Sequence, residues 1–168
     1  LLADEKVLSD KGLNVLRVAR GGDITFHGIG QIVLYPLLCL RNYGKDILIY
    51  LNALEDVVID FLKKYSIKGE SKEGLRGVWV SDEKIASIGI GATNWVSYHG
   101  LSINIANNLE YFKMINPCGI KGCQMTSLTK LLGPYAPGTE EAKRNLISSF
   151  LNIFNNMRTS YENLPVVA

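Results

Sequence analysis

Apolar residues recur at helical spacing in two long stretches of the chain. Beginning near Asp46, they fall at every third or fourth position as far as Leu62, which predicts an amphipathic helix packed on a sheet. The same spacing predicts a second long helix over Thr139–Met157. Thr139 is a suitable N-cap for this helix, and Glu140 and Glu141 follow it where the helix dipole favours negative charge.

Shorter runs rich in β-branched and aromatic residues predict the strands of the sheet. These runs are Leu13–Val18, Ile32–Tyr35, Gly77–Val80, Lys84–Ile90, Trp95–His99 and Leu101–Ile105, of which the last two form either two strands or one bent strand. Ser81–Glu83 predicts a hairpin turn, Lys68–Gly77 a loop, and Leu1–Gly12 and Asn107–Ile115 each a short helix. The prediction is one α/β (α+β) domain over residues 1–168, with a mixed, largely antiparallel sheet and packed helices.

Composition and charge exclude several classes of partner. The net charge is only +2 and the basic residues are scattered, so nucleic-acid binding is not expected. No apolar run approaches the length that spans a bilayer, and Leu1–Lys6 carries charges where a signal peptide has its apolar core. Three cysteines cannot all pair, which indicates a reducing compartment or a reactive thiol. We therefore expect no membrane partner and a cytoplasmic location, with an organellar form as the alternative.

The segment Arg20–Gln31 combines four glycines with Arg, Asp, Thr, His and Gln between two apolar runs. Glycine lets the backbone approach another group closely, and polar groups on a loop held by strands commonly form binding sites. Neither a Gly-Lys-Ser/Thr sequence nor a GxGxxG pattern is present, so the loop is not predicted to bind a nucleotide. A plain turn between strands is the alternative.

The three cysteines differ in their surroundings. Cys39 lies in an apolar run and is predicted to be a small buried side chain. Cys118 lies in a Pro-Cys-Gly turn, where backbone amides favour a thiolate, so it is a better candidate nucleophile than Cys123. A purely structural role is the alternative. Together with the two histidines these thiols would make a Cys₂His₂ set, but the spacing disfavours a metal site and none is expected.

Two histidines and one lysine complete the candidates for chemistry. His27 and His99 share an aromatic residue before and a glycine after, which predicts that they line one pocket wall. Lys84 opens an otherwise apolar strand, where it is either functional or a solvated residue after a turn.

These segments resemble the lipoyl(octanoyl) transferases. The matching motifs occur in the family's order and spacing, and they are Arg20–Gln31, Lys84–Ile90, Trp95–Asn104, and Pro117–Ile120 followed by Thr126–Leu128. The resemblance implies the fold shared with lipoate and biotin protein ligases. It also implies transfer of an octanoyl group from acyl carrier protein to a lysine of lipoyl domains of 2-oxoacid dehydrogenases or of the glycine-cleavage H protein.

The resemblance also assigns residues. Cys118 matches the nucleophile that forms an acyl thioester, and Lys84 matches the lysine that lowers the pKa of that cysteine. The substrate-binding positions are Arg20, Gly21, Gly22, Asp23, Ile24, Thr25, Phe26, His27, Ser87, Ile88, Gly89, Gly100, Leu101 and Ser102.

Exchange of one thioester for another is nearly isoenergetic, so neither ATP nor a cofactor is expected. Gly28, Gly30 and the small residues of the 84–90 strand are predicted to leave room for an acyl chain. Each buried methylene contributes about 0.8 kcal/mol, which gives a chain-length preference in a closed tunnel.

The sequence also departs from the family pattern. His27-Gly28-Ile29-Gly30 replaces His-Gly-Pro-Gly, residues 91–94 lack the usual basic side chains, and family members normally carry another strand-bearing segment before Leu1. The alternatives are an ATP-dependent lipoate-protein ligase on the same fold, a non-catalytic acyl- or carrier-binding module, and a zinc-stabilised interaction domain.

Overall fold

The computed structural model describes residue 2, residues 5–117 and residues 122–162 of the chain. The α-helices and strands in chain order are α1 (Glu5–Asp10), β1 (Gln31–Leu34), α2 (Ile47–Lys63), β2 (Glu70–Lys72), β3 (Leu75–Val80), β4 (Glu83–Thr93), β5 (Val96–Asn104), β6 (Gln124–Met125), α3 (Leu128–Leu132) and α4 (Thr139–Glu162). Short 3₁₀ helices cover Leu40–Tyr43, Leu109–Met114 and Gly133–Tyr135.

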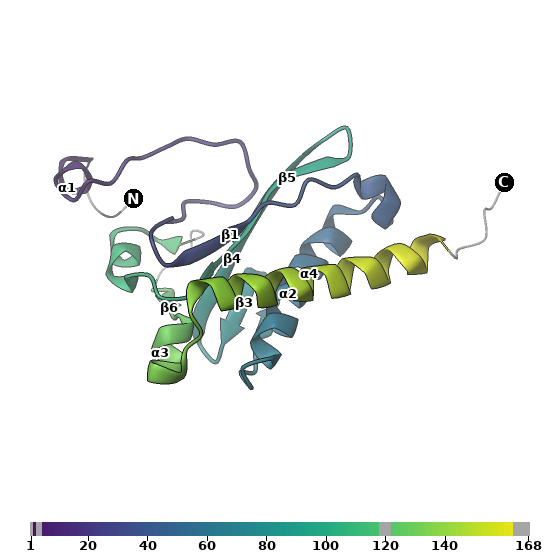
Figure 1. The fold of residues 1–168 in the computed structure, drawn as a ribbon. Coiled ribbons are helices and arrows are strands. Elements are labelled where there is room, and N and C mark those ends of the chain that lie inside the picture. The colour runs from purple at the N-terminus through teal and green to yellow at the C-terminus, as the bar shows by residue number, and fades with distance from the viewer. Residues whose placement is uncertain (1, 3–4, 118–121, 163–168) are drawn as a thin grey trace.

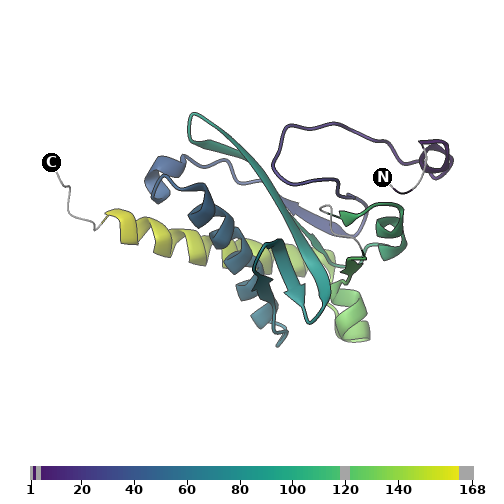
Figure 2. The same ribbon diagram turned by 180° about the vertical axis from the view of Figure 1, so that it is seen from behind.

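A largely antiparallel sheet carries two long helices on one face. The strand order is β1-β5-β4-β3-β2, all antiparallel, and β6 adds to β4 in parallel. Helix α2 packs on β3, β4 and β5, and α4 packs against α2 (Figure 1); Figure 2 shows the sheet from the opposite side. The core between them includes Leu54, Phe61, Leu146, Ile88 and Ile103. The predicted fold class is confirmed.

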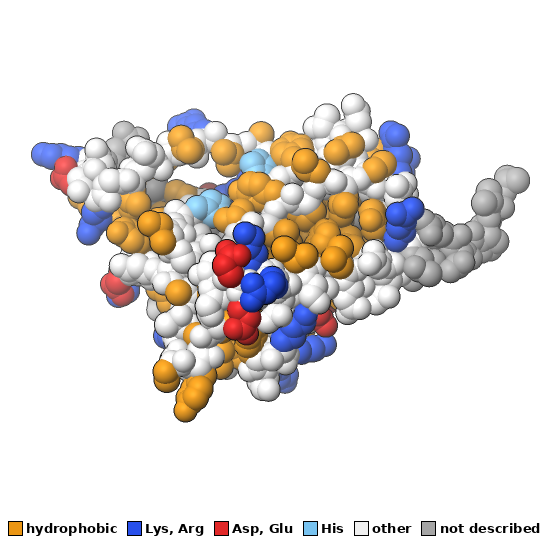
Figure 3. Space-filling view, in the orientation of Figure 1, with side chains coloured by type: hydrophobic (Ala, Val, Ile, Leu, Met, Phe, Trp, Pro, Cys, Tyr) orange, Lys and Arg blue, Asp and Glu red, His pale blue; other side chains and the backbone are white. Residues whose placement is uncertain are grey.

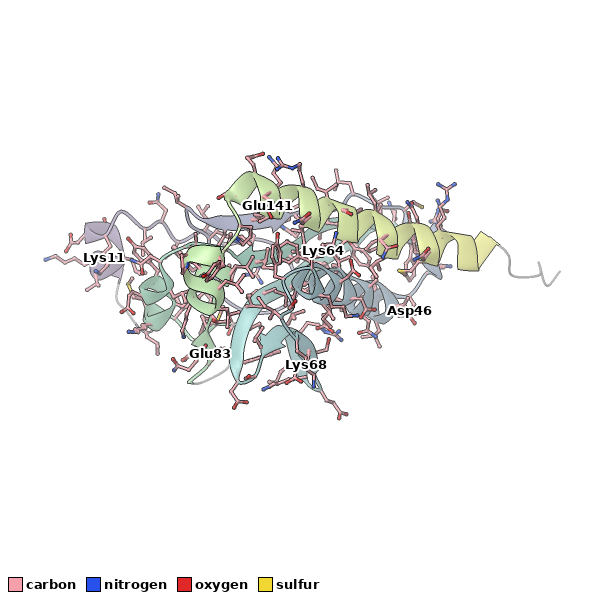
Figure 4. The ribbon with its side chains drawn as sticks, turned by 60° about the horizontal axis from the view of Figure 1, so that its bottom comes forward. Lys11, Asp46, Lys64, Lys68, Glu83 and Glu141 are labelled. Carbon is pink, nitrogen blue, oxygen red and sulfur yellow. The ribbon has the colours of Figure 1, made fainter. Side chains whose placement is uncertain are left out.

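Both long helices form where apolar periodicity predicts them. At the start of α2, the Asp46 carboxylate accepts hydrogen bonds from the backbone N–H groups of Leu48 (2.6 Å) and Ile49 (3.2 Å) (Figure 4). Helix α4 begins at Thr139, and the N–H of Ala142 donates to the Gly138 carbonyl at 2.9 Å. Gly138 therefore occupies the N-cap position, so the prediction of Thr139 as N-cap is wrong by one residue. Among the described residues, no helix is long and apolar enough to cross a membrane.

Two predicted segments differ from the structure. Residues 13–18 are irregular rather than a strand, and Val15, Leu16 and Val18 are exposed. The predicted 68–77 loop instead contains β2 and the start of β3. Its polar side chains do not indicate a strand, but backbone pairing between β2 and β3 makes one. The two predicted runs at 95–99 and 101–105 form one strand, β5 (Val96–Asn104).

Smaller differences concern the ends of elements and one cysteine. Residues 107–115 hold a 3₁₀ helix over Leu109–Met114, and α1 is confined to Glu5–Asp10. Helix α3 was not predicted. Cys39 is exposed rather than buried, because its segment runs along the molecular surface and pairs with Val96 through an isolated bridge.

Candidate functional site

The predicted segments Ser87–Gly89 and Gly100–Ser102 lie directly opposite each other on β4 and β5. Their register pairs Ser87 with Ser102 and Gly89 with Gly100. Between these pairs, Ile88 and Leu101 belong to the core under the helices. Because side chains alternate between the faces of a sheet, the serines and glycines lie on the face away from α2 and α4. We call these two segments the site floor.

The glycine-rich loop lies against this floor. The N–H of Gly21 donates to the Ile90 carbonyl at 2.7 Å. A Cβ at Gly89 would lie 2.8 Å from the Gly21 carbonyl oxygen and 3.1 Å from Cδ of Arg20, so the absent side chain lets the loop approach. A narrow cavity of about 20 Å³ remains between loop and floor. Its lining includes the predicted residues Arg20, Thr25, His27, Ser87, Ile88, Gly89, Gly100, Leu101 and Ser102.

Two larger cavities adjoin this narrow one. A cavity of about 500 Å³ shares Arg20, Thr25 and His27 with it and is also lined by Ile24 and Phe26. A cavity of about 310 Å³ shares Ile88 and Gly89 with it and is also lined by Gly21, Gly22 and two residues of α2. Asp23 instead accepts a hydrogen bond from the N–H of Ile24, at 2.7 Å.

The 500 Å³ cavity lies under residues 11–30, which we call the N-terminal arch. Its walls combine apolar side chains of the arch, such as Leu13 and Val18, with Arg20, His27 and His99. In the space-filling view the two histidines lie beside this hollow (Figure 3). The predicted pair of histidines thus lines one cavity, with positive charge next to apolar surface.

The arch is joined to the sheet through Gln31. Its amide group donates to the Phe26 carbonyl at 3.2 Å and to Asn104 Oδ1 at 2.8 Å, and its oxygen accepts from the N–H of Gly28 at 3.2 Å. Asn104, 2% exposed, in turn donates to the Thr126 carbonyl at 2.9 Å. Sequence reasoning missed Asn104, although a polar residue at the end of an apolar strand is a signal that could have found it.

His27 is held by the same glutamine, with Nδ1 lying 3.4 Å from Gln31 Oε1. Loss of hydration beside the cavity lowers the pKa of His27 below its usual value, and the charges of Arg20 and His99 act in the same direction. The hydrogen bond to Gln31 opposes this effect and is the smaller influence relative to burial. The neutral imidazole is therefore favoured.

Lys84 is fully buried and lies on the same side of the sheet as the site floor. The register pairs Val78 with Ala86 but Trp79 with Lys84, so an extra residue in β4 forms a β-bulge. Side chains of paired residues point to the same face of the sheet. Lys84 and Trp79 therefore share one face, and Val78 and Ala86 share the other. Its ammonium group donates to the Arg76 carbonyl at 2.7 Å and lies 5.5 Å from the centre of the Trp79 ring.

Cys118 lies outside the described residues. The described segment that follows it in sequence lies beside Lys84. Strand β6 pairs with Glu83 and Lys84, and the N–H of Thr126 donates to the Lys84 carbonyl at 2.9 Å. Cys123 is half-buried, with Sγ 3.9 Å from the sulfur of Met125.

Two glycines of the loop do not provide the predicted space for a ligand. A Cβ at Gly28 would lie 2.4 Å from the Phe26 ring, and one at Gly30 would lie 2.6 Å from the backbone nitrogen of Asn107. The space that these glycines leave is therefore filled by the protein itself.

Solved structures share this architecture. The fold resembles that of a lipoate-protein ligase A bound with ATP, with a TM-score of 0.69 at 11% identity over 94% of this chain and 69% of that one. It also resembles the biotin protein ligase of Aquifex aeolicus, with a TM-score of 0.61 at 16% identity over 77% of this chain and 55% of that one. At such low identity these similarities show the fold alone.

Sequence comparison then identifies the family. Residues 1–151 match the lipoyl protein ligase A/B catalytic domain family, and the chain belongs to that family. It is 49% identical to the octanoyltransferase of Syntrophobacter fumaroxidans over 83% of this chain and 61% of that protein. It is 43% identical to the octanoyltransferase of Flavobacterium psychrophilum over 92% of this chain and 69% of that protein. The chain thus spans about three fifths to seven tenths of the length of these two relatives.

Proposed function

We propose that this chain is an octanoyltransferase domain that moves an octanoyl group from acyl carrier protein to a lysine of a lipoyl domain. The observation that supports this proposal most strongly is that the chain is 49% and 43% identical to two proteins named octanoyltransferase. Most of the predicted substrate-binding residues line three cavities that share lining residues, which supports the same reaction. The proposed location is the cytoplasm.

The reaction proceeds in two acyl transfers. The Cys118 thiolate attacks the thioester carbonyl of the donor, and the carrier thiol leaves after taking up a proton. The neutral amine of the acceptor lysine then attacks the new thioester, which forms the amide and breaks the bond to sulfur, and the proton lost from the nitrogen passes to the departing sulfur to return the cysteine thiol. The first step exchanges one thioester for another, so the free energy available for acyl transfer is nearly unchanged and no nucleotide is consumed.

Lys84 would be the group that favours the thiolate and carries protons between the leaving and attacking groups. Its support is position: it is buried, it shares a face with the site floor, and β6 brings the chain after Cys118 beside it. The Ser–Gly floor and the predicted loop residues would hold the acyl group, with the adjoining cavities as routes for the chain and the carrier arm. The acceptors would be lipoyl domains and the glycine-cleavage H protein.

The test is the intact mass of the protein after mixing with octanoyl-acyl carrier protein, without ATP. The unaltered chain and the control Cys39→Ala should each gain one octanoyl group that hydroxylamine removes, whereas Cys118→Ala should gain none. Cys39 is a suitable control because it is exposed and distant in sequence from the proposed nucleophile.

Other outcomes have distinct meanings. An adduct that survives in Cys118→Ala would move the nucleophile, with Cys123 as the next thiol to replace. Absence of any adduct together with octanoylation that requires octanoate and ATP would replace the transferase with an adenylate-forming ligase.

A further inference from the structure

A buried carboxylate on α2 holds the beginning of β3. Glu55 is 5% exposed, and its Oε1 accepts a hydrogen bond from the N–H of Gly77 at 2.9 Å. Its Oε2 lies 3.4 Å from Nη1 of Arg76, which also donates to Asn52 at 2.8 Å. A buried carboxylate is costly unless such donors compensate it, so these contacts fix Glu55 and the Arg76–Gly77 backbone together.

The same peptide group binds Lys84 from its other end. The carbonyl of Arg76 and the N–H of Gly77 belong to one peptide bond, and this carbonyl accepts the hydrogen bond from Lys84 Nζ at 2.7 Å. In a planar trans peptide the two groups point in opposite directions, so the carboxylate and the ammonium group lie at opposite ends of one peptide dipole. Hydrogen bonds in such a chain polarise one another, so a carboxylate at the N–H makes the carbonyl oxygen a stronger acceptor.

Neighbouring groups closely confine the Lys84 side chain. Gly77 has a φ of 122°, and a Cβ there would lie 2.5 Å from Cε of Lys84 and 3.1 Å from its Nζ. The Trp79 ring, whose centre lies 5.5 Å from Nζ, forms another side, and its indole N–H is held by the Leu75 carbonyl at 3.2 Å. The lysine therefore reaches the Arg76 carbonyl only because position 77 has no side chain.

We propose that Glu55 is a positioning residue that fixes and polarises the Arg76–Gly77 peptide and thereby sets the position of the Lys84 ammonium group. Its effect on acyl transfer rests on the proposed function, in which Lys84 acts on the nucleophile. Its effect on the geometry of Lys84 does not depend on that function.

The first test measures the geometry directly in the free protein. Glu55→Gln keeps an oxygen acceptor of the same shape and removes the charge, and Asp56→Asn removes a charge from the adjacent, exposed position of the same helix. We expect Glu55→Gln to move the NMR signals of the Gly77 amide and of the Lys84 ammonium group and to speed proton exchange at both. Asp56→Asn should move both signals less than Glu55→Gln does, because Asp56 is exposed and interacts with Glu55 through charge. Unchanged signals in folded Glu55→Gln would overturn the proposal.

The second test measures octanoyl transfer. We expect kcat to fall about tenfold in Glu55→Gln and further in Glu55→Ala, with KM for the donor within about twofold of its original value. The smaller loss in the glutamine variant separates a specific contact from a general packing defect. A loss that follows the folded fraction alone, or equal rates in the two variants and the unaltered protein, would contradict positioning.

The two tests also separate this proposal from the proposed function. If Lys84→Met transfers octanoate at the original rate, the catalytic role of Lys84 is wrong, and the NMR signals still decide whether Glu55 positions it. If the signals respond and transfer depends on Lys84, both proposals are supported.

Discussion

The site floor and the N-terminal arch are built in opposite ways. The floor is part of two long strands whose backbones pair from Ala86 to Thr93, with core residues beneath it. The arch has no regular structure between Gly12 and Gln31, and its residue Leu16 is 80% exposed. Local opening costs least where buried contacts and protected hydrogen bonds are few. Under the proposed function, the floor would fix the reacting groups, whereas the arch would control the space available to a ligand.

The largest expected effect comes from the buried lysine on the floor side. In Lys84→Met we expect octanoyl transfer to fall by about 10³-fold, because a positioned proton-transfer group contributes about 10²–10⁴-fold. The fold should persist at a stability cost of about 1–3 kcal/mol, because methionine keeps the packing but leaves the Arg76 carbonyl without the hydrogen bond from Lys84. Transfer rate and thermal unfolding measured on the same sample check both statements.

Lys72 offers a matched control for this change. Its ammonium group lies 5.2 Å from the centre of the same Trp79 ring, but it pairs with the exposed Asp82. Lys72→Met should retain nearly the full rate. Equal losses in the two variants would mean that charge near Trp79 matters and that Lys84 has no special role.

A second experiment separates the arch from the floor. In Gln31→Ala the N–H of Gly28 and Asn104 each lose a partner, so we expect a stability loss of about 1–3 kcal/mol. Hydrogen exchange should rise at Phe26–Gly28 and stay slow at Ile88 and Leu101. Uniform acceleration across both regions would show that arch and floor open as one unit and would contradict the comparison.

The smallest effect concerns His27 in the arch. Because its pKa is lowered in the folded state, the unfolded chain binds more protons near pH 6.5, so this residue's stabilising contribution is present above that pH. This contribution is lost as the pH falls through the lowered pKa that His27 has in the folded state. His27→Gln should therefore lose less stability on acidification. Unfolding midpoints between about pH 5 and 8 compare the two proteins, and identical slopes would contradict the assignment.

The sequence predicts the helices and the central strands well because their signals are local. The apolar period and the Asp46 cap define α2, and the run Lys84–Ile90 is dense in β-branched residues. Leu13–Val18 is also rich in aliphatic residues but lines a cavity instead of pairing, since β-propensity reports a fit to neighbours more than a backbone preference. Strand β2 shows the converse case, a polar segment made into a strand by its partner.

The candidate site was predicted through motifs, and what lies outside the motifs was not. Gln31 belongs to the loop, but its partner Asn104 is 73 positions away and gains its meaning only from the register of β1 with β5. Glu55 is 22 positions from Gly77 and reads in the sequence as one more polar residue of a helix. Such contacts depend on tertiary packing, which no local pattern records.

The bulge beside Lys84 makes the motif Lys84–Ile90 impossible to transplant by sequence alone. In an unbroken strand, residues three apart face opposite ways, so a copy of this stretch in a regular sheet would turn its lysine away from Ser87. The direction of the lysine therefore depends jointly on β4 and β3, because the step from Val78 to Trp79 in β3 lies opposite the two-residue step from Ala86 to Lys84 in β4. Any design that borrows this strand has to borrow its neighbour as well.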